Sequence, residues 1–322
     1  MAEPILQVQD LRISFTTQES RVPVLHGLSY NLEPGQVLAV VGESGSGKTV
    51  HALSLLNLLP SNAHIDGGKI LYNGKNLLTL KEPALRKIRG RKIAMIFQDP
   101  GSSLNPVLTI GQQLVETLQA HQKISTQSAR KKAANLLEQV GIQEAQKRLD
   151  EYPFQFSGGM CQRVMIAMAL ALCPDILIAD EPTTALDVTI QAQILKLIKH
   201  LQAQNKLAAI FITHNLAVAA QVADEVLVLY AGQCMEKAPV KQLFSKPLHP
   251  YTQGLLASLL DVRKKISVLP MIAGNPPRPG EQIQGCPFAP RCPKAFKKCF
   301  QTCPPLFKQA NHEVRCFLQE GV

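Results

Sequence analysis

An apolar run passes directly into a glycine-rich loop in the stretch Val37-Leu38-Ala39-Val40-Val41-Gly42-Glu43-Ser44-Gly45-Ser46-Gly47-Lys48-Thr49. The last eight residues fit the phosphate-loop pattern G-x-x-x-x-G-K-S/T. A buried strand that runs through such a loop into a helix places consecutive backbone N–H groups around a polyphosphate. The pattern therefore predicts a nucleoside triphosphate site, with Lys48 at the β- and γ-phosphates and the Thr49 hydroxyl on Mg²⁺. Because such a turn can also be purely structural, the prediction needs support from further motifs.

A second apolar run, Ile176-Leu177-Ile178-Ala179-Asp180-Glu181, ends in two carboxylates. In NTPases with a phosphate loop, an Asp at the end of such a strand holds Mg²⁺, and a following Glu can polarise the attacking water. These roles fall on Asp180 and Glu181. The alternative interpretation is a buried strand capped by solvated acids. Beside the phosphate loop, however, the acidic strand favours hydrolysis of ATP or GTP.

The third motif is Ser157-Gly158-Gly159-Met160-Cys161-Gln162-Arg163, which precedes the acidic strand. By itself a Ser-Gly-Gly sequence is usually a plain loop. Here it resembles the signature of ABC-type ATPases, and it occurs among several motifs in that family's order. In the family a helix start presents the Ser hydroxyl and Gly N–H groups to the γ-phosphate bound by the opposite subunit, as suits a helix N-terminus. The resemblance therefore implies an ATPase whose sites are shared between two subunits.

The same resemblance assigns roles to further residues. Gln98 resembles the Q-loop glutamine, which contacts Mg²⁺ and the water and senses the membrane subunit. His214 resembles the switch histidine at the γ-phosphate, and Asp187 the D-loop aspartate that crosses the dimer interface. Phe15 is placed like the aromatic residue that stacks on adenine, although an aromatic residue on a first strand is more often part of the core. The predicted site thus comprises the catalytic residues Lys48, Gln98, Glu181 and His214, the Mg²⁺ ligands Thr49, Gln98 and Asp180, and the nucleotide-binding residues Phe15, Gly42, Glu43, Ser44, Gly45, Ser46, Gly47, Lys48, Thr49, Val50, Ser157, Gly158, Gly159, Gln162 and Asp187.

Three positions depart from the family's pattern, and the first is Thr49, which replaces the commoner Ser and keeps the Mg²⁺-binding hydroxyl. Phe156 precedes the signature Ser where the family usually has Leu, and Asn215 follows the switch histidine where Asp is commoner. Neither of these last two changes removes an atom that contacts phosphate. The resemblance therefore implies a competent site.

The order of predicted elements defines the fold class. Strands followed by helices dominate residues 1–100 and 170–230, which is the pattern of an α/β fold with a largely parallel sheet. Between them lies a charged helical stretch from Thr126 to Gly141, where Gly141 supplies the C-cap. We expect the last strand of the core at Val226–Tyr230.

The resemblance also implies a domain organisation. We expect an α/β P-loop NTPase with a RecA-like core over residues 1–260, into which an α-helical subdomain is inserted at about 100–168. Residues 261–322 then form a small Cys-rich C-terminal extension. The sequence contains one phosphate loop and one signature without an internal repeat, so the chain supplies half of a working dimer.

Hydropathy argues against a membrane-embedded chain. The apolar share of 46% permits a full core, but no run approaches the roughly 18–20 apolar residues that a membrane helix needs. The first residues do not resemble a signal peptide. We therefore expect a cytosolic protein, and the resemblance to ABC ATPases implies that partners hold it as a peripheral protein at the cytoplasmic face of the bacterial inner membrane.

Positive charge is concentrated near the C-terminus. The net charge is +10, and the residues from Asp261 onward contain ten Lys and Arg against four Asp and Glu. Such a segment suits anionic lipid headgroups or an acidic partner loop, and it is equally compatible with a solvated face. Aromatic residues are scarce and no recognition motif appears, so we expect no nucleic-acid partner.

Cysteines are also concentrated near the C-terminus, where five of the eight fall within residues 286–316. A disulfide framework is uncommon in the cytosol, so metal coordination is the better interpretation. Thiolates select zinc, copper or iron–sulfur clusters, and the spacing lacks the paired C-x₂-C of zinc knuckles. Cys161, Cys173 and Cys234 are interpreted as ordinary packing residues.

A narrower resemblance concerns the ATP-binding subunits of oligopeptide and dipeptide importers. It rests on the spacing of the C-terminal cysteines, on Gln98-Asp99-Pro100, on Asp187-Val188-Thr189-Ile190-Gln191-Ala192-Gln193 and on His249-Pro250-Tyr251-Thr252. Members of this group can carry a 4Fe-4S iron–sulfur cluster. The resemblance therefore implies the four ligands Cys286, Cys292, Cys299 and Cys316, with Cys303 as a spare. Zinc or a set of reduced thiols remains an alternative.

The resulting functional hypothesis is an ATPase subunit that energises peptide uptake. Its implied partners are a second ABC ATPase subunit in a heterodimer, two membrane permease subunits and an extracytoplasmic solute-binding protein. An importer of nickel or another solute is the alternative within the subfamily. A soluble ABC ATPase acting on nucleic acid is less favoured, because the chain has neither two cassettes nor a long coiled-coil insertion.

Overall fold

The computed structural model describes residues 3–18, 20–183, 187–258, 271–278, 280–281 and 283–321. The chain forms two compact units, Met1–Thr79 together with Phe211–Val322, and Leu80–Ile210. The domain boundary expected at residue 260 lies outside the described residues. In the described part, no helix is both long and apolar enough to cross a membrane.

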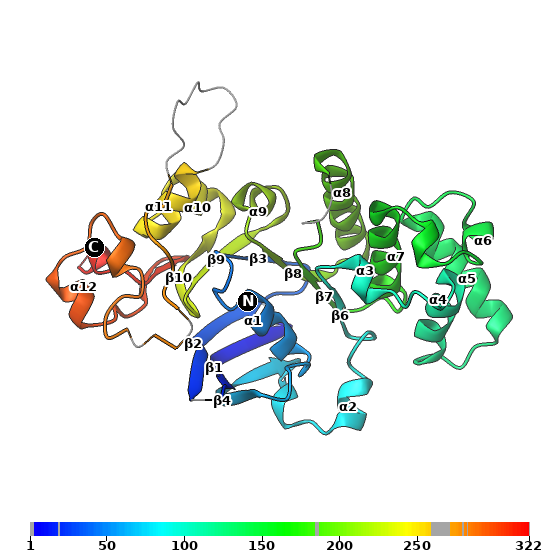
Figure 1. Cartoon of the computed structure of the whole chain (residues 1–322), viewed down its shortest axis with the longest axis horizontal. Coiled ribbons are helices and arrows are strands. Elements are labelled where there is room, and N and C mark those ends of the chain that lie inside the picture. The colour runs from blue at the N-terminus through cyan, green and yellow to red at the C-terminus, as the bar shows by residue number, and fades with distance from the viewer. Residues whose placement is uncertain are drawn as a thin grey trace. The chain divides into compact units, whose positions relative to one another are not determined.

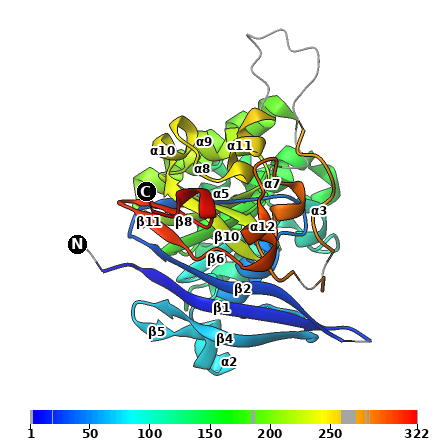
Figure 2. The same cartoon turned by 90° about the vertical axis from the view of Figure 1, so that its left-hand side faces the viewer.

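The first unit begins with an antiparallel sheet of strand order β2-β1-β4-β5. Figure 2 shows β1, β2 and β4 lying side by side. The turn between β1 and β2 is closed by the N–H of Thr17, which donates to the carbonyl oxygen of Ser20. The expectation of a largely parallel sheet is therefore wrong here, because β1 pairs antiparallel with both β2 and β4 and β4 pairs antiparallel with β5. The strands are β1 (Leu6–Thr16), β2 (Arg21–Leu32), β4 (Ala63–Tyr72) and β5 (Lys75–Asn76).

The phosphate loop belongs to a second sheet of this unit, with strand order β11-β12-β10-β9-β3-β8. Strands β3 and β9 pair in parallel, and every residue of β3 is buried. Continuous apolar runs of this kind are typical of strands covered on both faces. The strands are β3 (Val37–Val41), β8 (Ala208–Thr213), β9 (Glu225–Tyr230), β10 (Gln233–Pro239), β11 (Phe307–Gln309) and β12 (His312–Val314).

The strand expected at Val226–Tyr230 is confirmed as β9, but it is not the last one, because β10, β11 and β12 follow it among the described residues. Strand β10 pairs antiparallel with both β9 and β12. Its sequence hides this role because it contains the charged residue Glu236, which is fully buried. The carboxylate of Glu236 accepts hydrogen bonds from the backbone N–H groups of Leu248 and His249, and it lies 2.6 Å from Nε2 of His312. These partners satisfy the buried charge, so a polar residue serves as a core position.

Short helices complete the first unit. Figure 1 shows α10 and α11 in yellow and α12 in orange, near the C-terminus. The helices are α1 (Lys48–Leu55), α9 (Leu216–Val222), α10 (Val240–Ser245), α11 (Pro250–Ala257) and α12 (Lys297–Gln301), with single 3₁₀ turns η1 (Leu77–Thr79), η3 (Ala289–Arg291) and η4 (Phe317–Gln319).

The second unit is mainly helical, and Figure 1 shows α4 to α7 as a green group. The helix predicted from Thr126 is confirmed as α5, which Ser125 caps at its start by accepting from the N–H of Ser128. Gly141 follows its end with φ +79°, the left-handed conformation typical there. The elements are α2 (Glu82–Arg86), β6 (Ile93–Ile96), α3 (Pro100–Ser103), α4 (Ile110–Gln119), α5 (Thr126–Gln139), α6 (Ala145–Arg148), η2 (Pro153–Gln155), α7 (Gly158–Leu170), β7 (Ile176–Asp180) and α8 (Val188–Asn205).

His51 on α1 gives a testable dependence of stability on pH. Its ring is fully buried, with Nε2 2.6 Å from the hydroxyl oxygen of Tyr30, and burial lowers the pKa of His51 to about 4. Below about pH 6.5 the unfolded chain binds a proton that the folded chain excludes, so the free energy of unfolding falls as the pH drops from 6.5 to 4. This group contributes roughly 3 kcal/mol of that loss.

Chemical denaturation at pH 4.5 and 7 checks this dependence. His51→Gln should lose less stability on acidification than the parent, because glutamine does not titrate. His200→Gln, at an exposed position of α8, serves as the control and should keep the parent's dependence. Equal acid sensitivity in the parent and in His51→Gln would show that His51 is not the group responsible.

Candidate nucleotide site

The backbone of the phosphate loop requires glycine at three positions. A Cβ on Gly42 would overlap the carbonyl oxygen of Leu229. Gly45 and Gly47 have φ values of +78° and +100°, a region that L side chains rarely adopt. The loop therefore turns tightly between β3 and α1, with Gly47 as the N-cap of α1.

Lys48 lies over this loop. Its Nζ donates to the carbonyl oxygens of Gly42 and Glu43, both at 2.9 Å, and its side chain is almost fully buried. Ser46 is buried as well, whereas Ser44 and Thr49 are exposed. An ammonium held at the loop and a hydroxyl at the helix start are the groups that β- and γ-phosphates and Mg²⁺ require.

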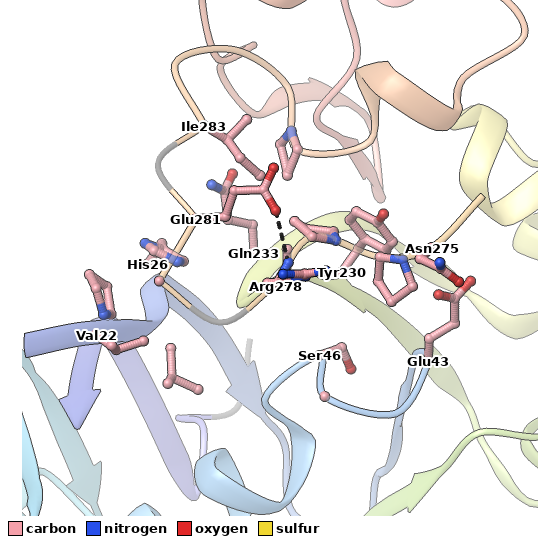
Figure 3. Close-up of a pocket in the computed structure, with 18 of the residues that line it drawn as sticks. Val22, His26, Glu43, Ser46, Tyr230, Gln233, Asn275, Arg278, Glu281 and Ile283 are labelled. Atoms are coloured by element: carbon pink, nitrogen blue, oxygen red, sulfur yellow. Dashed lines mark hydrogen bonds between the residues drawn. The ribbon is translucent and has the colours of Figure 1, made fainter. Parts of the chain in front are cut away.

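A cavity of about 810 Å³ lies beside the loop, within the first unit. Figure 3 shows Ser46 and Glu43 on one side of it and the C-terminal segment with Asn275, Arg278 and Glu281 on another. Phe15, the predicted adenine platform, is half-buried and pairs with Val22 across β1 and β2. It is not among the residues that line the cavity, so its stacking role remains a prediction.

The acidic strand and the Q-loop glutamine meet in the second unit. Asp180 ends β7 and is 2% exposed. The next residue, Glu181, has φ +45°, which costs a non-glycine residue roughly 1 kcal/mol. Nε2 of Gln98 donates to Oε2 of Glu181 at 3.1 Å. The structure thus brings together the amide and the carboxylate to which water activation was assigned.

The signature forms the start of α7, as the resemblance implied. Ser157 is the N-cap and accepts a hydrogen bond from the N–H of Met160 at 3.3 Å. Ser157 and Gly158 are exposed, while the side chain of Gln162, further along α7, is buried. The 13-residue helix therefore presents its positive end, a hydroxyl and a side-chain-free backbone to the outside.

The D-loop and switch residues also adjoin helix starts. Asp187 caps α8, where its Oδ1 accepts from the N–H groups of Thr189 and Ile190. Ala185 and Leu186, which precede it, lie outside the described residues. His214 is exposed after β8. Asn215 replaces the commoner Asp and caps α9, so this departure from the family pattern preserves a helix cap.

Four of the five C-terminal cysteines surround one small cavity of about 20 Å³, namely Cys286, Cys292, Cys299 and Cys316. Cys303 does not line it, and its thiol donates instead to Oε1 of Gln233. Burial raises the pKa of the Cys286 thiol to about 12 and raises the pKa of Cys292 and Cys316. In the described residues, no group of three or more His, Cys, Asp or Glu is placed to hold a metal ion.

The sequence did not predict that Tyr251 and Arg291, which lie far along the chain, contact the phosphate loop. Glu43 pairs with Arg291 at 2.8 Å, and its backbone N–H donates to the hydroxyl of Tyr251 at 3.1 Å. Burial raises the pKa of the Tyr251 hydroxyl, which therefore stays neutral. The His249-Pro250-Tyr251-Thr252 motif identified Tyr251 as a subfamily residue but did not indicate its hydrogen bond to Glu43. No local sequence pattern pointed to Arg291.

This geometry defines a cassette that binds a nucleoside triphosphate, and comparison with known proteins agrees. Residues 25–184 match the protein family described as "ABC transporter". Residues 235–299 match the family described as "Oligopeptide/dipeptide transporter, C-terminal region". A dimeric ATP-binding cassette, MJ0796 bound to ADP and Pi, superposes with a TM-score of 0.66 at 26% identity, covering 73% of this chain and 98% of that one.

Relatives that match nearly the whole chain have a higher sequence identity. The dipeptide transport ATP-binding protein DppD of Bacillus subtilis is 48% identical over 99% of this chain and 96% of its own length. The oligopeptide transport ATP-binding protein OppD of the same organism is 48% identical over 98% of this chain and 88% of its own. The chain belongs to the ABC transporter ATPase family, and it is an ATPase of that type.

The Gln98–Glu181 contact leads to a prediction about turnover. Glu181→Gln should lower kcat for ATP at least about 100-fold while ATP affinity changes by less than about threefold, because an amide keeps the shape but cannot accept a proton from water. Steady-state ATPase assays on the assembled transporter and equilibrium ATP titrations measure the two quantities.

Asp175→Asn is the matched control, because it removes a carboxylate just before β7 that pairs with Lys92. This variant should keep its activity. If Glu181→Gln loses ATP binding together with activity, Glu181 supports the loop structure instead of the chemistry.

Proposed function

We propose that this chain is the ATP-hydrolysing subunit of an importer that takes up peptides across the bacterial inner membrane. The observation that carries the proposal is the full-length similarity to dipeptide and oligopeptide transport ATP-binding proteins, including the C-terminal region at residues 235–299. A nickel importer, or an importer of another solute, is the alternative, since other chains of a transporter select the solute. An ABC ATPase acting on nucleic acid lacks such support.

The proposed mechanism places ATP between two ATPase subunits. Lys48 neutralises charge on the β- and γ-phosphates, and the partner subunit's signature helix completes the γ-phosphate site. Thr49, Gln98 and Asp180 would hold Mg²⁺, which supplies further charge neutralisation. Glu181 accepts a proton from the attacking water. Support for a shared site comes from the exposed Ser157 and Gly158 at the start of α7 and from the similarity to a dimeric cassette.

His214 and Asp187 complete this mechanism. We assign the His214 imidazole to the γ-phosphate and Asp187 to the interface between the two ATPase subunits. Both residues are exposed beside helix starts, which leaves their side chains accessible to a ligand or a partner. After hydrolysis, loss of the γ-phosphate removes the contacts that join the subunits, and the dimer opens.

The membrane partners are proposed to dock near Gln98. The second unit exposes several large apolar side chains, Phe97, Val107, Tyr152 and Phe154. The rings of Tyr152 and Phe154 stack at 5.7 Å, and the N–H of Ile110 donates to the carbonyl oxygen of Glu151, so this chain segment lies beside the start of α4. Exposed apolar groups of this kind suit a protein partner.

The proposed transporter contains this chain on the cytoplasmic face. It also contains two permease subunits, a second and different ATPase subunit and a solute-binding protein.

We also assign a 4Fe-4S cluster to Cys286, Cys292, Cys299 and Cys316. Their shared cavity and their soft sulfur donors support this assignment. The donor set fits the cluster, whereas in the described residues the thiols are not placed to hold a metal ion. Cluster binding requires the thiols to rearrange and to lose their protons. Zinc and reduced thiols are the alternatives.

Assembly should control ATP hydrolysis. The purified subunit alone should hydrolyse ATP slowly, because Ser157, Gly158 and Gly159 act on a site in another polypeptide. Adding the second ATPase and the permease subunits in lipid nanodiscs should raise kcat, and dipeptides with their binding protein should raise it further. Full activity of the dilute single subunit would exclude a shared site, and stimulation by Ni²⁺ instead of peptides would favour the other solute.

Anaerobic purification tests the cysteine assignment. The protein should be brown and contain about four iron and four sulfide per chain, as expected for a cubane cluster. Ser substitution at Cys286, Cys292, Cys299 or Cys316 should remove the colour, whereas Cys303→Ser should retain it as the matched control. Stoichiometric zinc without sulfide would assign the site to zinc.

A further inference from the structure

Glu43 is the one acidic residue within the phosphate loop, and the C-terminal segment binds it. Figure 3 shows its side chain rising from the loop toward the segment that carries Asn275. Oε2 of Glu43 accepts from Nη1 of Arg291 at 2.8 Å. The side chain of Arg291 is only 7% exposed, and that of Glu43 25%. A charge pair so far removed from solvent is weakly screened.

Arg291 is itself fixed by several contacts. Its Nε donates to the carbonyl oxygen of Ala273 at 3.0 Å, and Nη2 donates to that of Ile272 at 3.4 Å. Nη1 also donates to the hydroxyl of Tyr230 at 3.2 Å, and the guanidinium lies 5.8 Å from the centre of the Tyr230 ring. Multiple donors in a planar guanidinium fix the direction of the Glu43 carboxylate.

A second contact fixes the backbone of the same residue. The N–H of Glu43 donates to the hydroxyl of Tyr251, whose ring packs against Tyr230 at 4.6 Å and Phe288 at 5.2 Å. All three rings are buried. Both the side chain and the backbone of Glu43 are thus held by residues outside the loop, so its carboxylate cannot turn freely toward the ligand.

The charge of Glu43 makes these contacts matter for function. A carboxylate within the loop repels a polyphosphate, and at about 8 Å and an effective dielectric constant of 40 the repulsion amounts to roughly 1 kcal/mol per unit charge. A neighbouring cation cancels most of this effect. Because the γ-phosphate adds charge, the benefit is larger for ATP than for ADP.

We propose that Arg291 is a positioning residue of the ATP site, which neutralises Glu43 and holds its carboxylate away from the polyphosphate. Through Arg291, which directly precedes Cys292, the Cys-rich segment contributes to ATP affinity, although none of its residues was assigned to ATP chemistry. The inference rests on ATP binding at the phosphate loop and not on the identity of the transported solute.

The test measures ATP and ADP dissociation constants of the full chain by competition with a fluorescent ATP analogue. Arg291→Gln should weaken ATP binding about tenfold and ADP binding less, and 1 M NaCl should reduce the loss because salt screens repulsion. Glu43→Gln should tighten ATP binding about threefold. The double variant should return to within about threefold of the parent, since it removes both the unpaired carboxylate and its partner.

Controls separate this role from a structural one. Lys297→Gln removes a positive charge from an exposed position of α12 and should leave both dissociation constants unchanged. Thermal unfolding shows whether each variant folds. If Arg291→Gln does not fold, the ATP affinity of Glu43→Gln still tests the proposal, because this variant is expected to bind ATP more tightly.

The proposal is wrong if Glu43→Gln weakens ATP binding, or if the double variant binds no better than Arg291→Gln. It is also wrong if ATP and ADP lose affinity equally at every salt concentration. Absence of ATP binding by the parent would instead refute the nucleotide site itself.

Discussion

The phosphate loop depends on the close approach of Gly42 to the carbonyl oxygen of Leu229, which leaves no room for a side chain. Parallel pairing of β3 with β9 brings these two residues together. The turn after β9 also contacts the loop, because the N–H of Gly232 donates to the carbonyl oxygen of Ser46 at 3.0 Å. The orientation of the loop's N–H groups therefore depends on a strand far away in the sequence.

Local patterns predicted the elements that carry the chemistry. The apolar run before Gly42 and the acidic end of β7 are each determined by neighbouring residues, and both were placed correctly, whereas the helix start at Ser157 followed only from the family resemblance. The contacts of Glu43 could not be predicted in this way, because Tyr251 and Arg291 lie 208 and 248 residues from it. Pairings over such distances leave no periodicity or turn signal in a single sequence.

A buried polar residue accounts for one further failure of prediction. Strand β10 was missed because Glu236 interrupts its apolar character, yet backbone N–H groups of Leu248 and His249 make that carboxylate acceptable inside. The cysteines illustrate the opposite case. Composition identified the group, and the structure gathers four of them around one cavity, but residue type alone does not fix the distances that a metal needs.

The remote support of the loop has a consequence for synthesis of the chain. Gly42 to Thr49 leave the ribosome early, but Tyr251 and Arg291 follow Glu43 by 208 and 248 residues. At the usual pace of translation, this delay is on the order of 10–50 s. During that interval β9 and the aromatic cluster are absent or unpaired, so the nascent loop lacks the backing that shapes it. The loop therefore reaches its final set of contacts only after Arg291 has been synthesised and has paired with Glu43.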